Sequence, residues 1–222
     1  MKILLVQKDI TNGEIKTILD DVSDSDADLV LFNELAPTGC LYNGAEESDF
    51  PQIKDLSELC TGHPFEVMIG TPRWENGLMY NSYIYYGKDS TLIYDKINLF
   101  EPMNEHLHYQ PGQRSNIFDT KYGKFGVTIC YDVRFHALFD GFKKASVDYI
   151  LAPAAFPRVR INAYKKLLKE HAINTGKPVI AINAVGDDGT NEFGGSSMVI
   201  DNTGKIMAQA DEVNETIIEV EL

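Results

Sequence analysis

Short apolar runs recur along the chain, separated by stretches in which apolar residues come every three or four positions. A short continuous apolar run predicts a buried strand, and the wider spacing predicts a helix that buries one face. The runs place strands at Ile3–Gln7, Leu29–Phe32, Val67–Thr71, Ser82–Tyr86, Leu92–Asp95, Phe125–Ile129, Tyr149–Ala152, Val179–Asn183, Ser197–Asp201, Ile206–Ala210 and Thr216–Val220. The wider spacing places helices at Glu14–Val22, Pro51–Cys60, Arg134–Ala145 and Ala163–Asn174.

Turn residues separate several of these strands. Asn76-Gly77 and Asn202-Thr203-Gly204 tolerate the positive φ that tight hairpins require, and Gly87-Lys88-Asp89 is suited to turn the chain between the next pair. Mixed strands with helices outside them predict two sheets packed face to face. We therefore expect an α/β fold, a four-layer α-β-β-α sandwich of two mixed β-sheets.

Length and composition favour one domain over residues 1–222. With 222 residues, of which 44% are apolar, the chain is long enough for one substantial core, and no linker, repeat or low-complexity tract divides it. The 20 basic and 33 acidic residues give a net charge of −13, which disfavours nucleic-acid binding by broad electrostatic attraction.

Cysteine usage and the first residues bear on the compartment. Cys40, Cys60 and Cys130 form no close pair and no metal-ligand spacing, which is typical of a reducing compartment. The first apolar run is too short for a signal peptide or a membrane span. We expect a cytoplasmic protein that contacts no membrane.

Glu34, Lys96 and Cys130 each stand at the carboxyl end of an apolar run. Ligands gather outside the carboxyl ends of strands in sheets built from strand and helix units, so we expect these residues to meet. A thiolate attacks a carbonyl or nitrile carbon, a carboxylate moves protons, and a fixed positive charge stabilises an oxyanion. Cys130 also precedes a predicted helix, whose positive end favours thiolate over thiol.

Each of these residues, taken alone, has a plainer interpretation. Cys130 can be a small buried residue, Lys96 can belong to a surface ion pair and Glu34 can cap a loop. Glu105, further along, can be a solvated loop charge. We interpret Asp132 as structural, because it is placed to cap the next helix and to hold the turn that carries the thiol.

Three motifs in order resemble the nitrilase superfamily of carbon-nitrogen hydrolases. They are Phe32–Gly39 (FNELAPTG), Tyr94–Phe100 (YDKINLF) and Ile129–Phe135 (ICYDVRF), and Gly194–Asp201 (GGSSMVID) near the end fits as well. The resemblance spans nearly the whole chain and implies the same α-β-β-α fold.

The resemblance implies a role for each candidate. Glu34 would be the general base and Cys130 the nucleophile, with Lys96 and the backbone N–H of Tyr131 stabilising the oxyanion. Glu105 would be a second carboxylate that orients Lys96 and the substrate nitrogen. In the implied cycle the thiol attacks an amide, ammonia departs, and water cleaves the thioester without any metal or organic cofactor.

Within the superfamily, Glu105–Tyr109 (EHLHY) and the following Pro111-Gly112 resemble the omega-amidase branch, which hydrolyses the terminal amide of short 2-oxo acids. In that branch an arginine near the start of the fourth predicted helix is expected to pair with the substrate carboxylate. Arg160 matches this position best and Arg158 is its rival. A guanidinium fork fits a carboxylate bidentately, but an arginine in a surface ion pair is an equal alternative.

Other side chains are candidates for the pocket walls. Phe156 and Tyr42 are aromatic residues in segments that we expect to face the site, although aromatic residues are also common in cores. His106 and His108 lie in the loop between the Lys and Cys motifs, but without a third ligand they predict loop packing and no metal site.

The chain also departs from the superfamily pattern. It has Ala163-Tyr164 where relatives often carry His-Trp, and His171–Thr175 (HAINT) where they have Arg-Ala-Ile-Glu-Asn. These changes bear on the choice of substrate more than on the type of reaction. The resemblance implies a homodimer, although the tail by which many relatives embrace their partner is not expected after the last predicted strand.

The sequence therefore predicts a thiol-dependent hydrolase that acts on a small-molecule amide, most similar to an omega-amidase. Hydrolysis of nitriles or N-carbamoyl compounds is the near alternative, because it uses the same nucleophile. Two alternatives come from other functional classes. One is a catalytically idle binding module on the same fold, and the other is a redox sensor whose Cys130 reacts with peroxide.

Overall fold

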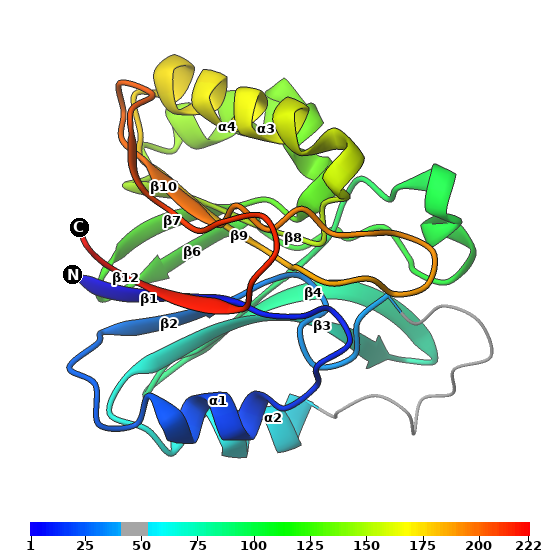
Figure 1. Ribbon diagram of the computed structural model, residues 1–222, viewed down its shortest axis with the longest axis vertical. Helices are drawn as coiled ribbons and strands as arrows, with labels where there is room; N and C mark the ends of the chain where they lie inside the picture. Colours follow the sequence, from blue (N-terminus) through cyan, green and yellow to red (C-terminus); the bar gives the residue numbers. More distant parts are fainter. Residues whose placement is uncertain (41–52) are drawn as a thin grey trace.

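The computed structural model, which describes residues 1–40 and 53–222, contains two six-stranded sheets packed face to face, with two helices outside each sheet (Figure 1). The first sheet has the order β12-β1-β2-β3-β4-β5, with β1 (Lys2–Gln7), β2 (Leu29–Phe32), β3 (Glu66–Glu75), β4 (Leu78–Tyr86), β5 (Thr91–Asp95) and β12 (Thr216–Glu221). The second has the order β11-β10-β9-β8-β7-β6, with β6 (Ile117–Thr120), β7 (Gly123–Val127), β8 (Tyr149–Ala154), β9 (Val179–Asn183), β10 (Met198–Ile200) and β11 (Ile206–Gln209). The predicted four-layer sandwich is confirmed.

Helices α1 (Ile15–Asp21) and α2 (Ile53–Thr61) cover the first sheet, and α3 (His136–Lys144) and α4 (Ile161–Thr175) cover the second (Figure 1). The period of two along each strand explains this layering. In β1, Ile3 and Leu5 pack into the core between the sheets, whereas Leu4 and Val6 pack into the core beneath α1 and α2. Strands that are apolar on both faces thus hold the four layers together.

The strand directions bring several carboxyl ends to one edge. β1, β2 and β3 are parallel, and β5 runs in the direction of β3 because two antiparallel pairings separate them. In the second sheet β7, β8 and β9 are parallel. A parallel bridge between Asp9 and Val185 joins the segments that follow β1 and β9. The segments after β2, β5, β7 and β8 therefore converge on the same side of the molecule.

Most predicted elements are present, and the main differences have physical reasons. The helix expected from Arg134 starts at His136, because residues 130–134 form a separate 3-10 turn, η4 (Cys130–Arg134), and Phe135 is extended. β6 was not predicted, since only its first two residues are apolar and it is an edge strand. β3 and β4 extend further than predicted, to the Asn76-Gly77 hairpin turn.

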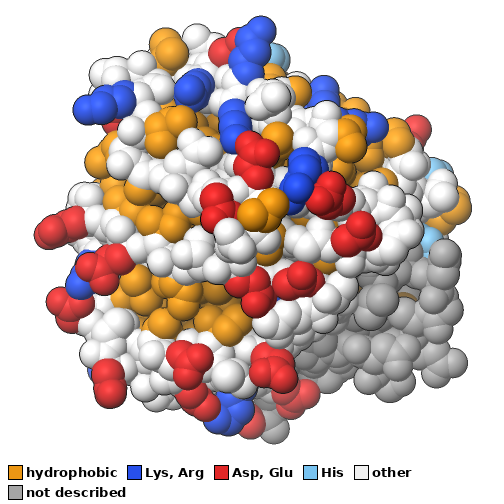
Figure 2. Space-filling view, in the orientation of Figure 1, with side chains coloured by type: hydrophobic (Ala, Val, Ile, Leu, Met, Phe, Trp, Pro, Cys, Tyr) orange, Lys and Arg blue, Asp and Glu red, His pale blue; other side chains and the backbone are white. Residues whose placement is uncertain are grey.

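The loop between β5 and β6 contains two 3-10 turns, η2 (Glu101–Met103) and η3 (Glu105–Leu107), that the sequence pattern did not indicate. Asn104 joins them in the left-handed conformation, with φ of 57°. On the face drawn in Figure 2, Lys and Arg side chains gather over the α3 and α4 layer, and Asp and Glu side chains are spread more widely. No helix in the described part of the chain is long and apolar enough to cross a membrane.

Candidate active site

Glu34, Lys96 and Glu105 form one buried cluster. The ammonium Nζ of Lys96 donates to Oε1 of Glu34 at 2.9 Å and to both carboxylate oxygens of Glu105 at 2.9 Å. These three side chains come from the ends of β2 and β5 and from η3, and all are at most 3% exposed. The convergence expected from their positions after strands is therefore present, and Glu105 joins it.

Asn81, which sequence reasoning missed, bridges the two carboxylates. Its Nδ2 donates to Oε1 of Glu34 at 2.7 Å and to Oε1 of Glu105 at 2.8 Å. Backbone N–H groups complete the cluster, from Ala155 to Oε2 of Glu34 at 2.8 Å and from Phe100 to Oε2 of Glu105 at 2.6 Å. The one sequence signal for Asn81 is a polar residue at a fully buried position inside β4.

Cys130 begins η4, directly after the segment that continues β7. Its φ of 47° lies in the left-handed region, which is uncommon for a residue with a side chain. Sγ lies 3.8 Å from the carbonyl oxygen of Ala155, and Cys130 is partly exposed. The strained turn thus presents the sulfur beside the carboxylate cluster.

The resting sulfur is a thiol, which corrects the expectation of a thiolate. Burial, and after it the charge of Glu34, raises the pKa of Cys130 well above its ordinary value, and Lys96 opposes this only in part. The five-residue 3-10 turn contributes little of the helix field that the sequence suggested.

Lys96 keeps its charge despite burial. Burial alone would lower its pKa, but the adjacent carboxylates of Glu105 and Glu34 outweigh this and raise the pKa well above the usual lysine value. The cluster therefore presents a permanent positive charge next to the sulfur.

Asp95 anchors the strand end that carries Lys96. Its carboxylate accepts bonds from Arg73 at 2.8 Å and 3.0 Å, from Arg114 at 3.0 Å and from Ser82 at 2.6 Å. Asp95 and Arg73 are buried, so removing either partner would leave an uncompensated charge.

Asp132 holds the turn of Cys130, as predicted. Its carboxylate accepts bonds from the N–H of Ile129 at 3.0 Å, from the Tyr94 hydroxyl at 2.7 Å and from the N–H and side chain of Asn98 at 3.0 and 2.8 Å. The turn is thereby tied to the loop that follows β5.

The cavity at Cys130 is narrow, with a volume of about 20 Å³, which is room for about one water molecule. Arg160 and Phe156, both predicted to face the site, line it, and so does Arg134, which was not predicted. Arg158 points elsewhere, since it pairs with Glu192 at 2.8 Å. Tyr42 lies outside the described residues.

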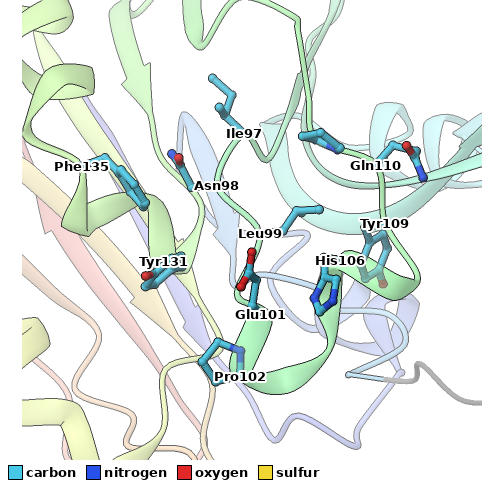
Figure 3. A pocket seen from close by; sticks show the side chains of 11 residues that line it. Ile97, Asn98, Leu99, Glu101, Pro102, His106, Tyr109, Gln110, Tyr131 and Phe135 are labelled. Carbon is cyan, nitrogen blue, oxygen red and sulfur yellow. The ribbon is translucent and has the colours of Figure 1, made fainter.

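A larger cavity of about 670 Å³ shares Tyr131 with the narrow one, and its lining is drawn in Figure 3. Tyr131 and Phe135 stand on one wall, and His106 and Tyr109 stand on the wall opposite (Figure 3). Within the described residues, no three His, Cys, Asp or Glu side chains are grouped so that they could hold a metal ion.

The positions that depart from the superfamily pattern support the walls of the site. Tyr164 stacks on Phe156 with ring centroids 4.5 Å apart and donates to the carbonyl of Ala152 at 2.8 Å. Nε2 of His171 lies 2.7 Å from the carbonyl oxygen of Val133 in η4. Burial lowers the pKa of His171, so the neutral ring donates this bond.

A thiol and a Glu–Lys–Glu cluster at the strand ends of an α-β-β-α sandwich define a class of cysteine-centred α/β proteins. Comparison with models of protein families shows which family of this class is present. Residues 7–222 match the model of the carbon-nitrogen hydrolase family. The chain belongs to the carbon-nitrogen hydrolase family.

Named relatives and solved structures agree with this assignment. The chain is 29% identical over 203 residues to the 2-oxoglutaramate amidase of Bacillus subtilis, covering 88% of this chain and 78% of that protein. It is 28% identical over 197 residues to the deaminated glutathione amidase of Yersinia enterocolitica, covering 81% and 69%. The crystal structure of a carbon-nitrogen hydrolase superfamily protein from Xanthomonas campestris, with an arsenic adduct in its active site, superposes with a TM-score of 0.87 at 26% identity and covers 99% of this chain and 89% of that one.

Proposed function

We propose that this protein is a thiol-dependent amidase that hydrolyses the terminal amide of a small carboxylate-bearing substrate and releases ammonia. The single observation that carries the proposal is the Lys96 ammonium, held at 2.9 Å by both Glu34 and Glu105 beside the strained Cys130. The similarity to the 2-oxoglutaramate amidase of Bacillus subtilis supports the substrate class.

The first half-reaction begins with a proton transfer. Glu34 takes the proton of Cys130 as Sγ attacks the amide carbon, and the developing oxyanion is stabilised by Lys96 and the N–H of Tyr131. That N–H lies in the first turn of η4, where backbone donors have no intrahelical acceptor. Glu34 then passes the proton to the nitrogen, the C–N bond breaks, and ammonia leaves behind a thioester.

The second half-reaction uses the same carboxylate. Glu34 accepts a proton from water, the resulting hydroxide attacks the thioester carbon, and the C–S bond breaks. The proton returns to sulfur, which restores the thiol and releases the acid. Glu105 orients Lys96 throughout, since it contacts the ammonium with both of its oxygens.

Substrate recognition falls to residues that line the narrow cavity beside the thiol. Arg160 is exposed, lines the cavity and lies 5.2 Å from the ring of Phe100. Its guanidinium is placed to pair with the substrate carboxylate, while Phe156 forms an apolar wall. The ion pair of Arg158 with Glu192 supports Arg160 over Arg158 in this role.

Ammonia release from glutaramate and 2-oxoglutaramate tests the function. Wild type should release ammonia, and Cys130→Ala should not, with circular dichroism showing that the variant is folded. Mass spectrometry of a rapidly quenched mixture should find an acyl group on Cys130. Ammonia release that persists in Cys130→Ala would refute the proposal, and peroxide oxidation of Cys130 without any turnover would favour the redox sensor.

We also propose that residues 1–222 act as one domain in a cytoplasmic homodimer. Cys60 and Cys130 are not in disulfides, which is consistent with a reducing compartment, and the superfamily resemblance supports the dimer. Light scattering coupled to gel filtration distinguishes a dimer from a monomer of 24.9 kDa.

A further inference from the structure

The five arginines of the chain fall into two groups. Arg73, Arg114 and Arg158 form ion pairs with carboxylates. Arg134 and Arg160 have no carboxylate partner within residues 1–40 and 53–222, and both line the cavity that contains the thiol. The two guanidinium groups without a carboxylate partner in the described part of the chain therefore lie together at the proposed reaction centre.

This placement is unusual for a chain with a net charge of −13. The residues that line the cavity are Phe100, Met103, Cys130, Tyr131, Arg134, Ala155, Phe156, Pro157 and Arg160, and no Asp or Glu is among them. Guanidinium groups stay protonated at any ordinary pH. Positive charge along the lining of a cleft concentrates anions, so the two arginines favour a substrate whose carboxylates lie away from the Glu34–Lys96–Glu105 cluster.

Each guanidinium rests on its own aromatic ring. The Arg160 guanidinium lies 5.2 Å from the Phe100 ring centroid, and that of Arg134 lies 5.9 Å from the ring centroid of Tyr131. The rings of Phe100 and Tyr131 pack against each other, with their centroids 4.9 Å apart. Stacking on a ring leaves the N–H edge of a guanidinium available for a carboxylate. The two rings thus support two separate points of anion recognition.

On the basis of the proposed amidase function, we infer that Arg134 is a specificity-determining residue that acts beside Arg160. The preferred substrate is then an amide that carries two carboxylates, one for each guanidinium. The carboxylate–guanidinium pair is the strongest charge-assisted contact that these side chains offer. The apolar walls hold the carbon chain between the carboxylates and the reacting amide.

Three primary amides with the same five-carbon chain test the inference: neutral pentanamide, glutaramate with one carboxylate, and the terminal monoamide of tricarballylate with two. For wild type, kcat/KM for ammonia release should rise with each carboxylate. In Arg134→Gln the ratio of kcat/KM for the two-carboxylate amide to that for pentanamide should fall at least about tenfold, the effect of about 1.4 kcal/mol. Arg134→Lys should recover part of the ratio.

Lys16→Gln is the matched control, because it removes one positive charge from α1, in the opposite outer layer, at a side chain that is 72% exposed. It should leave the ratio unchanged. If Arg134→Gln slows pentanamide as much as the two-carboxylate amide, Arg134 merely supports the ring of Tyr131, and the inference is overturned.

A binding measurement separates this inference from the proposed function. Calorimetry with Cys130→Ala needs no turnover, and tricarballylate should bind at least about tenfold more tightly than glutarate. The advantage should disappear when Arg134→Gln is added. Equal binding of the two acids overturns the inference while ammonia release still supports the amidase. Absence of ammonia release from every amide refutes the amidase, and the binding preference still decides the role of Arg134.

Discussion

Cys130 keeps its proton in the resting protein, because burial and the carboxylate of Glu34 together outweigh the opposing charge of Lys96. The proposed base is therefore also a cause of the raised pKa. Its two influences on the sulfur have opposite consequences for chemistry: Glu34 disfavours the free thiolate, yet it is the acceptor that forms the nucleophile when substrate is present.

Removing the charge of Glu34 should separate these influences. In Glu34→Gln the pKa of Cys130 should fall, so iodoacetamide at pH 8 should alkylate Cys130 faster than in wild type, although ammonia release should drop at least about a hundredfold. Lys96→Met should slow alkylation, because it removes the charge that lowers the thiol pKa. Mass spectrometry assigns the alkylated residue. Slower alkylation in Glu34→Gln would show that the carboxylate does not control this proton.

Prediction of the candidate site residues from the sequence depended on their position directly after predicted strands. Glu34, Lys96 and Cys130 were found because each follows an apolar run, and strand ends converge. Asn81 and Arg134 were missed because their proposed roles depend on contacts across the site. Asn81 lies inside a strand, and no local pattern indicates that Arg134 lacks an ion-pair partner among the described residues.

At the scale of elements, the approach of β3 to the segment after β2 positions Glu34. The N–H of Gly70 donates to the carbonyl of Asn33 at 3.2 Å, and the carbonyl of Gly70 accepts from Ala36 at 2.8 Å. A Cβ at position 70 would lie 2.6 Å from both the Asn33 oxygen and the Glu34 Cα. Only glycine allows this contact between the two backbones.

Two glycine substitutions should have opposite effects on stability. Gly70→Ala should lower the free energy of unfolding by about 1–3 kcal/mol and reduce ammonia release, because it forces the Glu34 segment away from β3. Gly141→Ala, in the interior of α3 with open space around the added Cβ, should raise the free energy of unfolding by about 0.5–1 kcal/mol and leave activity intact. Urea unfolding measures both. A Gly70→Ala protein as stable and active as wild type would contradict the proposed role of the close approach.

The elements that the sequence predicted are those with a continuous apolar pattern, such as β1, β2 and β9, which are buried on both faces. The 3-10 turn at Cys130 was not predicted, and the helix expected from Arg134 begins at His136. The turn depends on the distant Tyr94 and Asn98, which bond Asp132. Contacts of this kind lie outside any local pattern.

At the scale of the whole molecule, the segment after β1 joins the two sheets. The N–H of Ile10 donates to the carbonyl of Val185 at 2.9 Å, and the N–H of Val185 donates to the carbonyl of Lys8 at 3.0 Å. Lys8 is buried, and its Nζ donates to the carbonyls of Asp9 and Ala36, each at 2.8 Å. Burial lowers the pKa of Lys8 from 10.5 to about 8. Its side chain therefore ties the site segment to the joint between the sheets.

The lowered pKa of Lys8 predicts a pH dependence of global stability. Between about pH 8 and 10.5 the unfolded chain holds the lysine proton and the folded protein releases it, so this residue makes the folded state more stable as pH rises. The difference in unfolding free energy, wild type minus Lys8→Met, should therefore increase across that window, by at most about 1.4 kcal/mol per pH unit. Buried tyrosines with a raised pKa, such as Tyr83, also make stability depend on pH, but they are present in both proteins, so taking the difference removes their contribution. A constant difference would show that the pKa of Lys8 is not lowered.

The overall architecture was predictable because mixed strands with external helices have few ways to bury both faces of each sheet. The joint between the sheets was not, since Lys8 and Val185 are far apart in sequence and their pairing follows from the assembled layers.

Two carboxylates and one ammonium give the Glu34–Lys96–Glu105 cluster a net charge of −1 at rest. In the proposed cycle a proton shuttles between the sulfur, Glu34 and either the departing ammonia or the entering water, and ammonia and water are both neutral. No ion has to be drawn from bulk solvent, nor any lost to it, during bond making and breaking. Once the substrate amide is in place, the cavity beside the thiol therefore exchanges only two small neutral molecules, ammonia and water.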